Sequence, residues 1–129
     1  MKYNRVVTFD ATVRGHKGEA QDLHWPIYHT NVAMSVGERA AVVCAEVIRN
    51  AKQREEVLAS LMESGKEIID LTMHQLHEFA GNMLQVKDKK DAKFWVMSSR
   101  AYASLSSPQK KSLRKDGSEI LHSPLPTIE

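Results

Sequence analysis

Polar and apolar residues alternate near the start of the chain. Over residues 3–13 the odd positions are mostly apolar and the even positions mostly polar. Alternation with a period of two, rich in β-branched and aromatic residues, is typical of a half-buried strand. A turn sequence follows at 15–18, and alternation resumes at 23–27. We therefore predict a β-hairpin over residues 1–30, with the second strand at a sheet edge because it contains Pro26.

The hydrophobic period becomes helical after Asn31. Ser35 and Glu38 have the S-x-x-E spacing of a capping box, in which each side chain bonds the other residue's backbone amide. Apolar residues then recur at intervals of three, four and seven, at Cys44, Ile48, Ala51, Leu58 and Met62. This spacing predicts one long helix that ends at Gly65.

The helical period continues beyond Gly65. Residues 66–86 carry an apolar stripe made of Ile69, Met73, Leu76, Ala80 and Met83. The short connection at 64–65 favours an antiparallel helical hairpin formed with the preceding helix. A third helix is expected over 91–105.

End signals predict a short fourth helix over 108–115. Ser107 and Pro108 are a good N-cap and first-turn pair, and Asp116 with Gly117 is a good stop. The predicted fold class is α+β, mostly α, with an N-terminal β-hairpin, a long antiparallel helical hairpin and two shorter helices. The 129 residues fall in the size range of a single domain. We expect one domain over 1–129, in which residues 31–117 are helical and residues 118–129 form an extended tail.

Composition and cysteine content indicate an ordinary soluble protein. The longest uncharged apolar run, Ala40 to Ala45, is far shorter than the ~20 residues that span a bilayer. Asp10 interrupts the N-terminal segment where a secretory signal would need apolar residues. The single Cys44 cannot support a disulfide framework and lies on a predicted apolar stripe, so we expect an unreactive, packed thiol. These features predict a cytoplasmic protein without a membrane partner.

A net charge of only +2 conceals a local imbalance. Residues 33–86 carry five bases and eight acids, whereas residues 87–117 carry nine bases and three acids. The nine bases are Lys87, Lys89, Lys90, Lys93, Arg100, Lys110, Lys111, Arg114 and Lys115. Such a segment is a candidate surface for nucleic acid or phosphate, provided that the third and fourth helices pack back to back. The alternative is a solvated, lysine-rich face.

Four polar residues recur along one flank of the predicted second helix: Glu67, Asp70, His74 and His77. Carboxylates and imidazoles at these spacings can converge on one ion, so Asp70, His74 and His77 are candidate metal ligands. The pattern lacks H-E-x-x-H, and no second Glu-x-x-His pair occurs on another helix. A solvated flank with local Asp–His contacts is therefore favoured over a metal site.

The predicted hairpin offers two further candidates. Its turn has a G-x-x-G pattern between strands rather than between helices, which argues against a phosphate-clamping loop. The turn leaves a basic tip, made of Arg14, His16 and Lys17, as a candidate site for a partner's acidic or phosphate groups. Downstream, Tyr28 and His29 near the strand end are expected to be exposed, whereas Trp25 fits the buried face.

No sequence pattern supports a specific catalytic reaction. The leading hypothesis is a small non-enzymatic binding or regulatory protein that acts through protein–protein contacts, as a homo-oligomer, with no cofactor. One alternative is a nucleic-acid-binding accessory protein that uses residues 87–117. Another is a metal-dependent enzyme centred on Asp70, His74 and His77.

Overall fold

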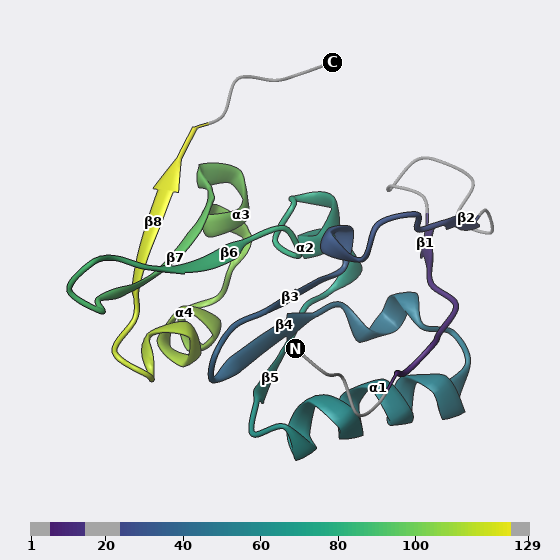
Figure 1. The fold of residues 1–129 in the computed structure, drawn as a ribbon. Coiled ribbons are helices and arrows are strands. Elements are labelled where there is room, and N and C mark those ends of the chain that lie inside the picture. The colour runs from purple at the N-terminus through teal and green to yellow at the C-terminus, as the bar shows by residue number, and fades with distance from the viewer. Residues whose placement is uncertain (1–5, 15–23, 125–129) are drawn as a thin grey trace.

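A computed structural model describes residues 6–14 and 24–124 of the chain (Figure 1). The strands are β1 (Thr12–Arg14), β2 (His24–Pro26), β3 (Met34–Val36), β4 (Ala40–Val43), β5 (Glu67–Asp70), β6 (Leu84–Lys87), β7 (Lys93–Ser98) and β8 (Glu119–Ser123). The α-helices are α1 (Ala51–Glu63), α2 (Met73–His77), α3 (Ser99–Ser104) and α4 (Ser107–Arg114), and the 3-10 turns are η1 (Thr30–Val32) and η2 (Ala45–Val47). Every helix within the described residues is too short or too polar to span a bilayer.

The N-terminal strands pair as the alternation indicated. β1 and β2 are antiparallel, with Val13 opposite Trp25. Each strand has only three residues. Trp25 is 44% exposed, so the prediction that it is buried is wrong. The turn between the strands, including His16 and Lys17, lies outside the described residues.

Two consecutive segments share one topology. In the first unit (residues 34–70), β3 is antiparallel to β4, and after α1 the chain returns as β5, parallel to β4. In the second unit (residues 84–123), β6 is antiparallel to β7, and after α3 and α4 the chain returns as β8, parallel to β7. The structure therefore contains a repeated ββαβ unit, with α2 in the connection between the two copies.

The prediction of a mostly helical fold with a long helical hairpin is wrong, because residues 6–14 and 24–124 contain eight short strands in three sheets. The apolar run at 40–43 is β4, in which all four residues are buried. A strand covered on both faces loses its alternation and cannot be distinguished from a helix by period alone. Ser35 caps no helix, since it lies within β3.

The same error affected the downstream helices. The stripe predicted for residues 66–86 is divided between β5, α2 and the segment before β6, although each of its apolar residues is buried. The helix predicted for 91–105 is β7 followed by α3, which begins after the N-cap Ser98. Residues 119–123, expected in an extended tail, form β8.

End signals located helix boundaries better than the hydrophobic period did. α1 ends near Gly65, whose φ of 85° is a left-handed conformation that favours glycine. α4 has a capping box between Ser106 and Gln109, one residue before the predicted N-cap, and Gly117 follows it with a φ of 88°.

One face of the sheet formed by β3, β4 and β5 packs against the second unit. Val42 and Ile69 on that face share a buried cluster with Trp95 of β7 and Leu113 of α4. A Cβ at Gly37 would lie 2.5 Å from the Trp95 ring, so only glycine allows the turn after β3 to approach β7 this closely. The buried cluster therefore includes side chains of both units, together with Val57 of α1.

One face of the sheet formed by β6, β7 and β8 is apolar and exposed. Leu84 pairs with Val96, which pairs with Leu121, so these side chains lie in one row across three strands. Their exposed fractions are 64%, 40% and 48%. Rows of this kind are uncommon on solvent-facing sheets. A single chain does not test the predicted homo-oligomer, which stays a prediction.

Two backbone segments cross closely between the units. Gly81 precedes β6, and a Cβ there would lie 2.3 Å from the carbonyl oxygen of Val32 in η1. The Ser35 hydroxyl donates to the Gly81 carbonyl (2.5 Å) and accepts from the Met83 amide (3.0 Å). Ser35 thus ties β3 to the entrance of β6. We call residues 29–33 and 79–83 the crossing; Figure 1 shows the short blue turn before β3 beside α2.

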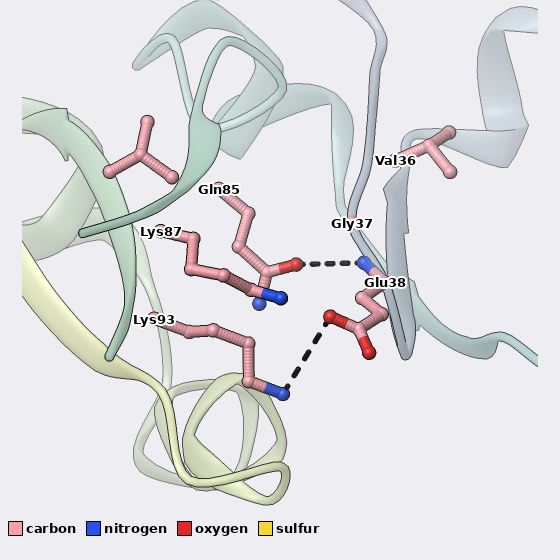
Figure 2. A pocket seen from close by; sticks show the side chains of 7 residues that line it. Val36, Gly37, Glu38, Gln85, Lys87 and Lys93 are labelled. Atoms are coloured by element: carbon pink, nitrogen blue, oxygen red, sulfur yellow. Dashed lines mark hydrogen bonds and ion pairs between the residues drawn. The ribbon is translucent and has the colours of Figure 1, made fainter. Parts of the chain in front are cut away.

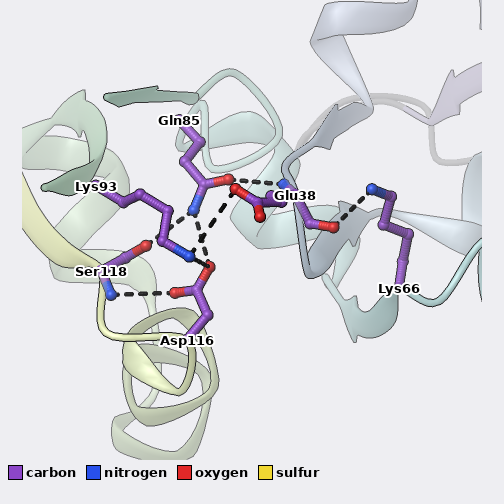
Figure 3. Close-up of polar contacts among 6 residues, drawn as sticks. All are labelled: Glu38, Lys66, Gln85, Lys93, Asp116 and Ser118. Carbon is purple, nitrogen blue, oxygen red and sulfur yellow. Dashed lines mark hydrogen bonds and ion pairs between the residues drawn. The ribbon is translucent and has the colours of Figure 1, made fainter. Parts of the chain in front are cut away.

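Away from the crossing, a network of polar side chains also joins the two units (Figure 3). The Gln85 side chain accepts from the Glu38 amide (2.7 Å) and donates to Asp116 (3.2 Å) and Ser118 (2.8 Å). The Lys93 ammonium pairs with Asp116 at 3.2 Å and lies 4.0 Å from the Glu38 carboxylate. The network connects the turn after β3 to β6, to β7 and to the loop after α4.

The two contacts of Ser35 predict a specific loss of stability. Ser35→Ala leaves a buried carbonyl and a buried amide without their partner, which should lower the free energy of unfolding by about 1–3 kcal/mol. Gly81→Ala should also lower the free energy of unfolding by about 1–3 kcal/mol, because the added methyl group overlaps a backbone oxygen. Urea unfolding measures both. A variant at either position that is as stable as the wild type would contradict this account of the crossing.

Asp116 predicts a pH dependence of stability. Burial opposes ionisation, but hydrogen bonds from Ser118, Gln85 and Lys93 outweigh it and lower the pKa of Asp116 from 3.8 to about 2. A lowered pKa in the folded state stabilises the fold above the unfolded value, and that stabilisation is lost as pH falls from about 4 to about 2. The difference in unfolding free energy between wild type and Asp116→Asn should therefore shrink across this range in urea titrations. Asp91→Asn, on an exposed turn, is the matched control, and a pH-independent difference would contradict the prediction.

Candidate functional site

The structure distributes the nine predicted basic residues over several elements. Lys87 ends β6, Lys89 and Lys90 lie in the following turn, and Lys93 begins β7. Arg100 lies in α3, whereas Lys110, Lys111, Arg114 and Lys115 lie in α4 or at its end. The first lysine cluster lies at a β-turn between β6 and β7 rather than at the start of a helix, because the predicted third helix is β7 followed by α3.

Several of these bases already contact other side chains. Lys93 pairs with Asp116, and Lys115 pairs with Glu67 at 3.4 Å. The Lys110 ammonium lies 3.9 Å from the centroid of the Tyr102 ring. These contacts reduce the charge that the segment presents to solvent, and they do not test nucleic-acid binding. Of the predicted hairpin tip, Arg14 ends β1, and its two companions fall outside the described residues.

A small cleft opens beside the polar network. Figure 2 shows it between the turn after β3 and strands β6 and β7. Its volume is about 250 Å³, and it is lined by Val36, Gly37, Glu38, Gln85, Val86, Lys87 and Lys93. The lining contains two ammonium groups and one carboxylate, but no imidazole, hydroxyl or thiol. Of its charged groups, Lys93 is paired with Asp116 and lies 4.0 Å from the Glu38 carboxylate, so these two side chains belong to the polar network.

The candidate metal ligands do not form a site. Asp70 is the last residue of β5, whereas His74 and His77 lie in α2. Thr72 begins α2 with a capping box, so Asp70 does not share a helix with the histidines as the sequence spacing suggested. Within residues 6–14 and 24–124, no three histidine, cysteine or acidic side chains are grouped so that they could hold a metal ion.

Cys44 directly follows β4 and is fully buried. Burial raises the pKa of its thiol to about 11, and the charges of Glu46 and Asp70 add to this effect. A thiol that stays protonated and inaccessible at neutral pH is a poor nucleophile. The structure thus agrees with the expectation that Cys44 is packed and unreactive.

A hydroxyl and an imidazole meet on the second unit. Ser99 Oγ and His122 Nδ1 are 2.8 Å apart, and the His122 ring stacks on Tyr102 with centroids 4.1 Å apart. A serine nucleophile needs its histidine to be oriented by a third group, commonly a carboxylate. In the described part of the chain no carboxylate bonds His122. This pair is therefore not a complete nucleophilic site.

The crossing presents a different set of groups. His29 precedes η1 in extended conformation, and its carbonyl accepts from the Val32 amide (3.1 Å). His29 and Asn31 are exposed on one segment, and Phe79 and Asn82 are exposed on the other. Beneath them, Ala33, Ala80, Gly81 and Met83 are buried. The crossing therefore carries an imidazole, two carboxamides and an aromatic ring on a tightly packed base.

Backbone strain distinguishes the second segment of the crossing. Phe79 has a φ of 66°, a conformation that is rare for a bulky residue and occurs most often at functional sites. The Phe79 carbonyl accepts from the Asn82 amide (3.0 Å), which closes the turn. The turn is the C-terminal cap of α2, because the Phe79 amide donates to the Leu76 carbonyl (2.9 Å) and the Ala80 amide to the Gln75 carbonyl (3.0 Å), at a position where glycine is usual.

Of the exposed groups at the crossing, sequence reasoning identified only His29. Tyr28 and His29 were expected to be exposed, and Tyr28 is 85% exposed. Phe79, Gly81 and Asn82 were missed, because residues 66–86 were interpreted as one helix. The available signal was Gly81, since an isolated glycine within a helical pattern weakens that interpretation.

Comparison with known proteins identifies the class of this molecule. A family model described as N,N dimethylarginine dimethylhydrolase, eukaryotic, matches residues 2–129. No curated protein and no solved structure shows a significant match.

The family match corrects the functional predictions. A dimethylhydrolase is an enzyme, so the predictions of a non-enzymatic binding or regulatory protein and of no enzymatic activity are wrong. The expected helical bundle is also wrong, since the fold is mixed α and β. Composition could not reveal this, because the residues of the crossing form no short motif. Since the match extends over nearly the whole sequence, the chain belongs to the eukaryotic N,N-dimethylarginine dimethylhydrolase family.

Proposed function

We propose that the chain acts in the hydrolysis of a methylated guanidinium group, as in N,N-dimethylarginine, with His29 as the proton-transfer residue. The family match supports the reaction class. The observation that supports the location is the exposed imidazole of His29 at a strained, tightly packed crossing.

The chemistry of the reaction explains the need for an imidazole. Hydrolysis adds an oxygen derived from water to the guanidinium carbon and breaks its bond to the dimethylamino nitrogen. The products are a ureido group and dimethylamine, and the nitrogen must gain a proton before it departs. Histidine is the side chain that most readily gives and takes protons near neutral pH. His29 would protonate the departing nitrogen.

The other described histidines are less suited to this role. His122 bonds Ser99 and stacks on Tyr102, which fixes its ring in another part of the molecule. His74 and His77 lie on α2, and His77 is only partly exposed. His29 alone among them lies in irregular backbone, three residues before Val32, whose carbonyl lies against Gly81. Loops held by a rigid base are common positions for catalytic side chains.

Neighbouring groups at the crossing suit a guanidinium substrate. The carboxamide oxygens of Asn31 and Asn82 can accept hydrogen bonds from guanidinium N–H groups. The Phe79 ring already carries the Arg100 guanidinium, but its exposed part can contact the substrate's methyl groups.

Replacing His29 tests the proposed function. His29→Gln keeps a polar side chain but cannot act as an acid near neutral pH. We expect kcat/KM for release of dimethylamine from N,N-dimethylarginine to fall by about 10²–10⁴-fold. The matched control is His74→Gln, an exposed histidine on α2, for which kcat/KM should stay within about threefold. Full activity of His29→Gln would exclude the proposed role.

Cys44 gives a second test, because a reactive cysteine would place the chemistry elsewhere in the chain. We expect a thiol reagent to label the native protein at least about 100-fold more slowly than the urea-unfolded protein, since the thiol is buried and protonated. Labelling kinetics followed by mass spectrometry measure the ratio. Rapid native labelling of Cys44 with parallel loss of hydrolysis would contradict the assignment.

A further inference from the structure

Arg100 contacts the strained turn of the crossing from the second unit. Its Nε donates to the carboxylate of Glu78. Its guanidinium carbon lies 5.1 Å from the centroid of the Phe79 ring. One side chain of α3 therefore contacts two consecutive residues at the start of the turn.

The turn needs such a contact because its conformation is unfavourable. Phe79 has a φ of 66°, and no glycine relieves the strain at that position. Strained backbone persists only where the surrounding structure over-determines it. On the α2 side, the Ala80 amide donates to the Gln75 carbonyl (3.0 Å). On the α3 side, Arg100 supplies the side-chain contacts that hold Phe79 and Glu78.

The position of the turn determines the geometry of the proposed site. Phe79 is only two residues from Gly81, which contacts the Val32 carbonyl and bonds Ser35. Val32 in turn donates its amide to the His29 carbonyl. A shift of the turn would therefore move Asn82 directly and His29 through η1.

We propose that Arg100 is a positioning residue that fixes the crossing in its active geometry, through Glu78 and Phe79. This inference rests on the proposed function at His29. Arg100 touches neither His29 nor Asn82 in the structure and has no proposed contact with substrate. Its effect is expected on the turnover step, because misplacement of a proton donor by about 1 Å is costly for catalysis.

An arginine suits this position better than a lysine. The planar guanidinium can lie over an aromatic ring and donate from its edge to a carboxylate at the same time. A lysine ammonium can keep the ion pair, but it loses the planar contact with the ring. Lysine should therefore restore part of the function that alanine removes.

The experiment compares Arg100→Ala and Arg100→Lys with wild type in the intact enzyme. Two quantities are measured: amide hydrogen exchange at Asn82 and Met83, and kcat and KM for N,N-dimethylarginine. We expect Arg100→Ala to accelerate exchange at these amides and lower kcat by at least about tenfold with little change in KM, and Arg100→Lys to fall between. Arg114→Ala, which removes an exposed arginine from α4, is the matched control and should match wild type.

The outcomes separate this inference from the proposed function. Unchanged exchange at Asn82 and Met83 in Arg100→Ala would overturn the inference, whatever the activity. Faster exchange with unchanged kcat would also overturn it, since Arg100 would then be structural only. Retained activity of His29→Gln would reject the proposed function, while the exchange data would still report whether Arg100 holds the turn.

Discussion

The close approach of two backbone segments at Ser35 and Gly81 is the constraint on which the rest of the structure depends. One hydroxyl bonds a carbonyl and an amide from the entrance of β6, and the missing side chain of Gly81 leaves room for the Val32 carbonyl. Without this contact the two ββαβ units would have no fixed spacing at that end. The same contact brings η1 and the Phe79 turn together, so the geometry of the site follows from the packing of the units.

The two ends of the interface between the units use different physical interactions. At the crossing, the contact is short-range and depends on shape, with buried small residues beneath exposed polar ones. At the other end, Gln85, Lys93 and Asp116 form a charged, hydrogen-bonded network around a small cleft (Figures 2 and 3). Between these ends, Trp95 and Val42 belong to one apolar cluster. A rigid interface of this kind can support exposed catalytic side chains on irregular backbone, where a loop alone would not hold them.

Helix ends could be predicted from the sequence, whereas strands that are buried on both faces could not. Helix ends at Gly65 and Gly117 were predicted correctly, because glycine adopts the left-handed conformation locally, and the N-cap of α4 was predicted one residue late, at Ser107 instead of Ser106. Residues 40–43 were assigned to a helix because a strand buried on both faces has no visible period.

The candidate site was harder to predict than the helix ends, because it joins residues about 50 positions apart in the sequence. His29 was recognised as exposed, but nothing in its neighbours indicates that the following turn would cross the chain at Gly81. The basic residues were conspicuous in the sequence, yet Lys93 and Lys115 form ion pairs within the fold. The exposure and charge of single residues could therefore be predicted, whereas contacts between segments far apart in the sequence could not.

The separation of Ser35 and Gly81 along the chain has a consequence for the order of folding. Strand pairing within each unit joins residues at most 27 positions apart, as between Ala40 and Glu67, whereas the Ser35 hydroxyl meets Gly81 across 46 positions. Closing the longer loop costs more conformational entropy, and long-range contacts generally slow folding. The units should acquire their sheets before the crossing closes. The site proposed at His29 would then be assembled in the last step of folding, after the secondary structure of both units has formed.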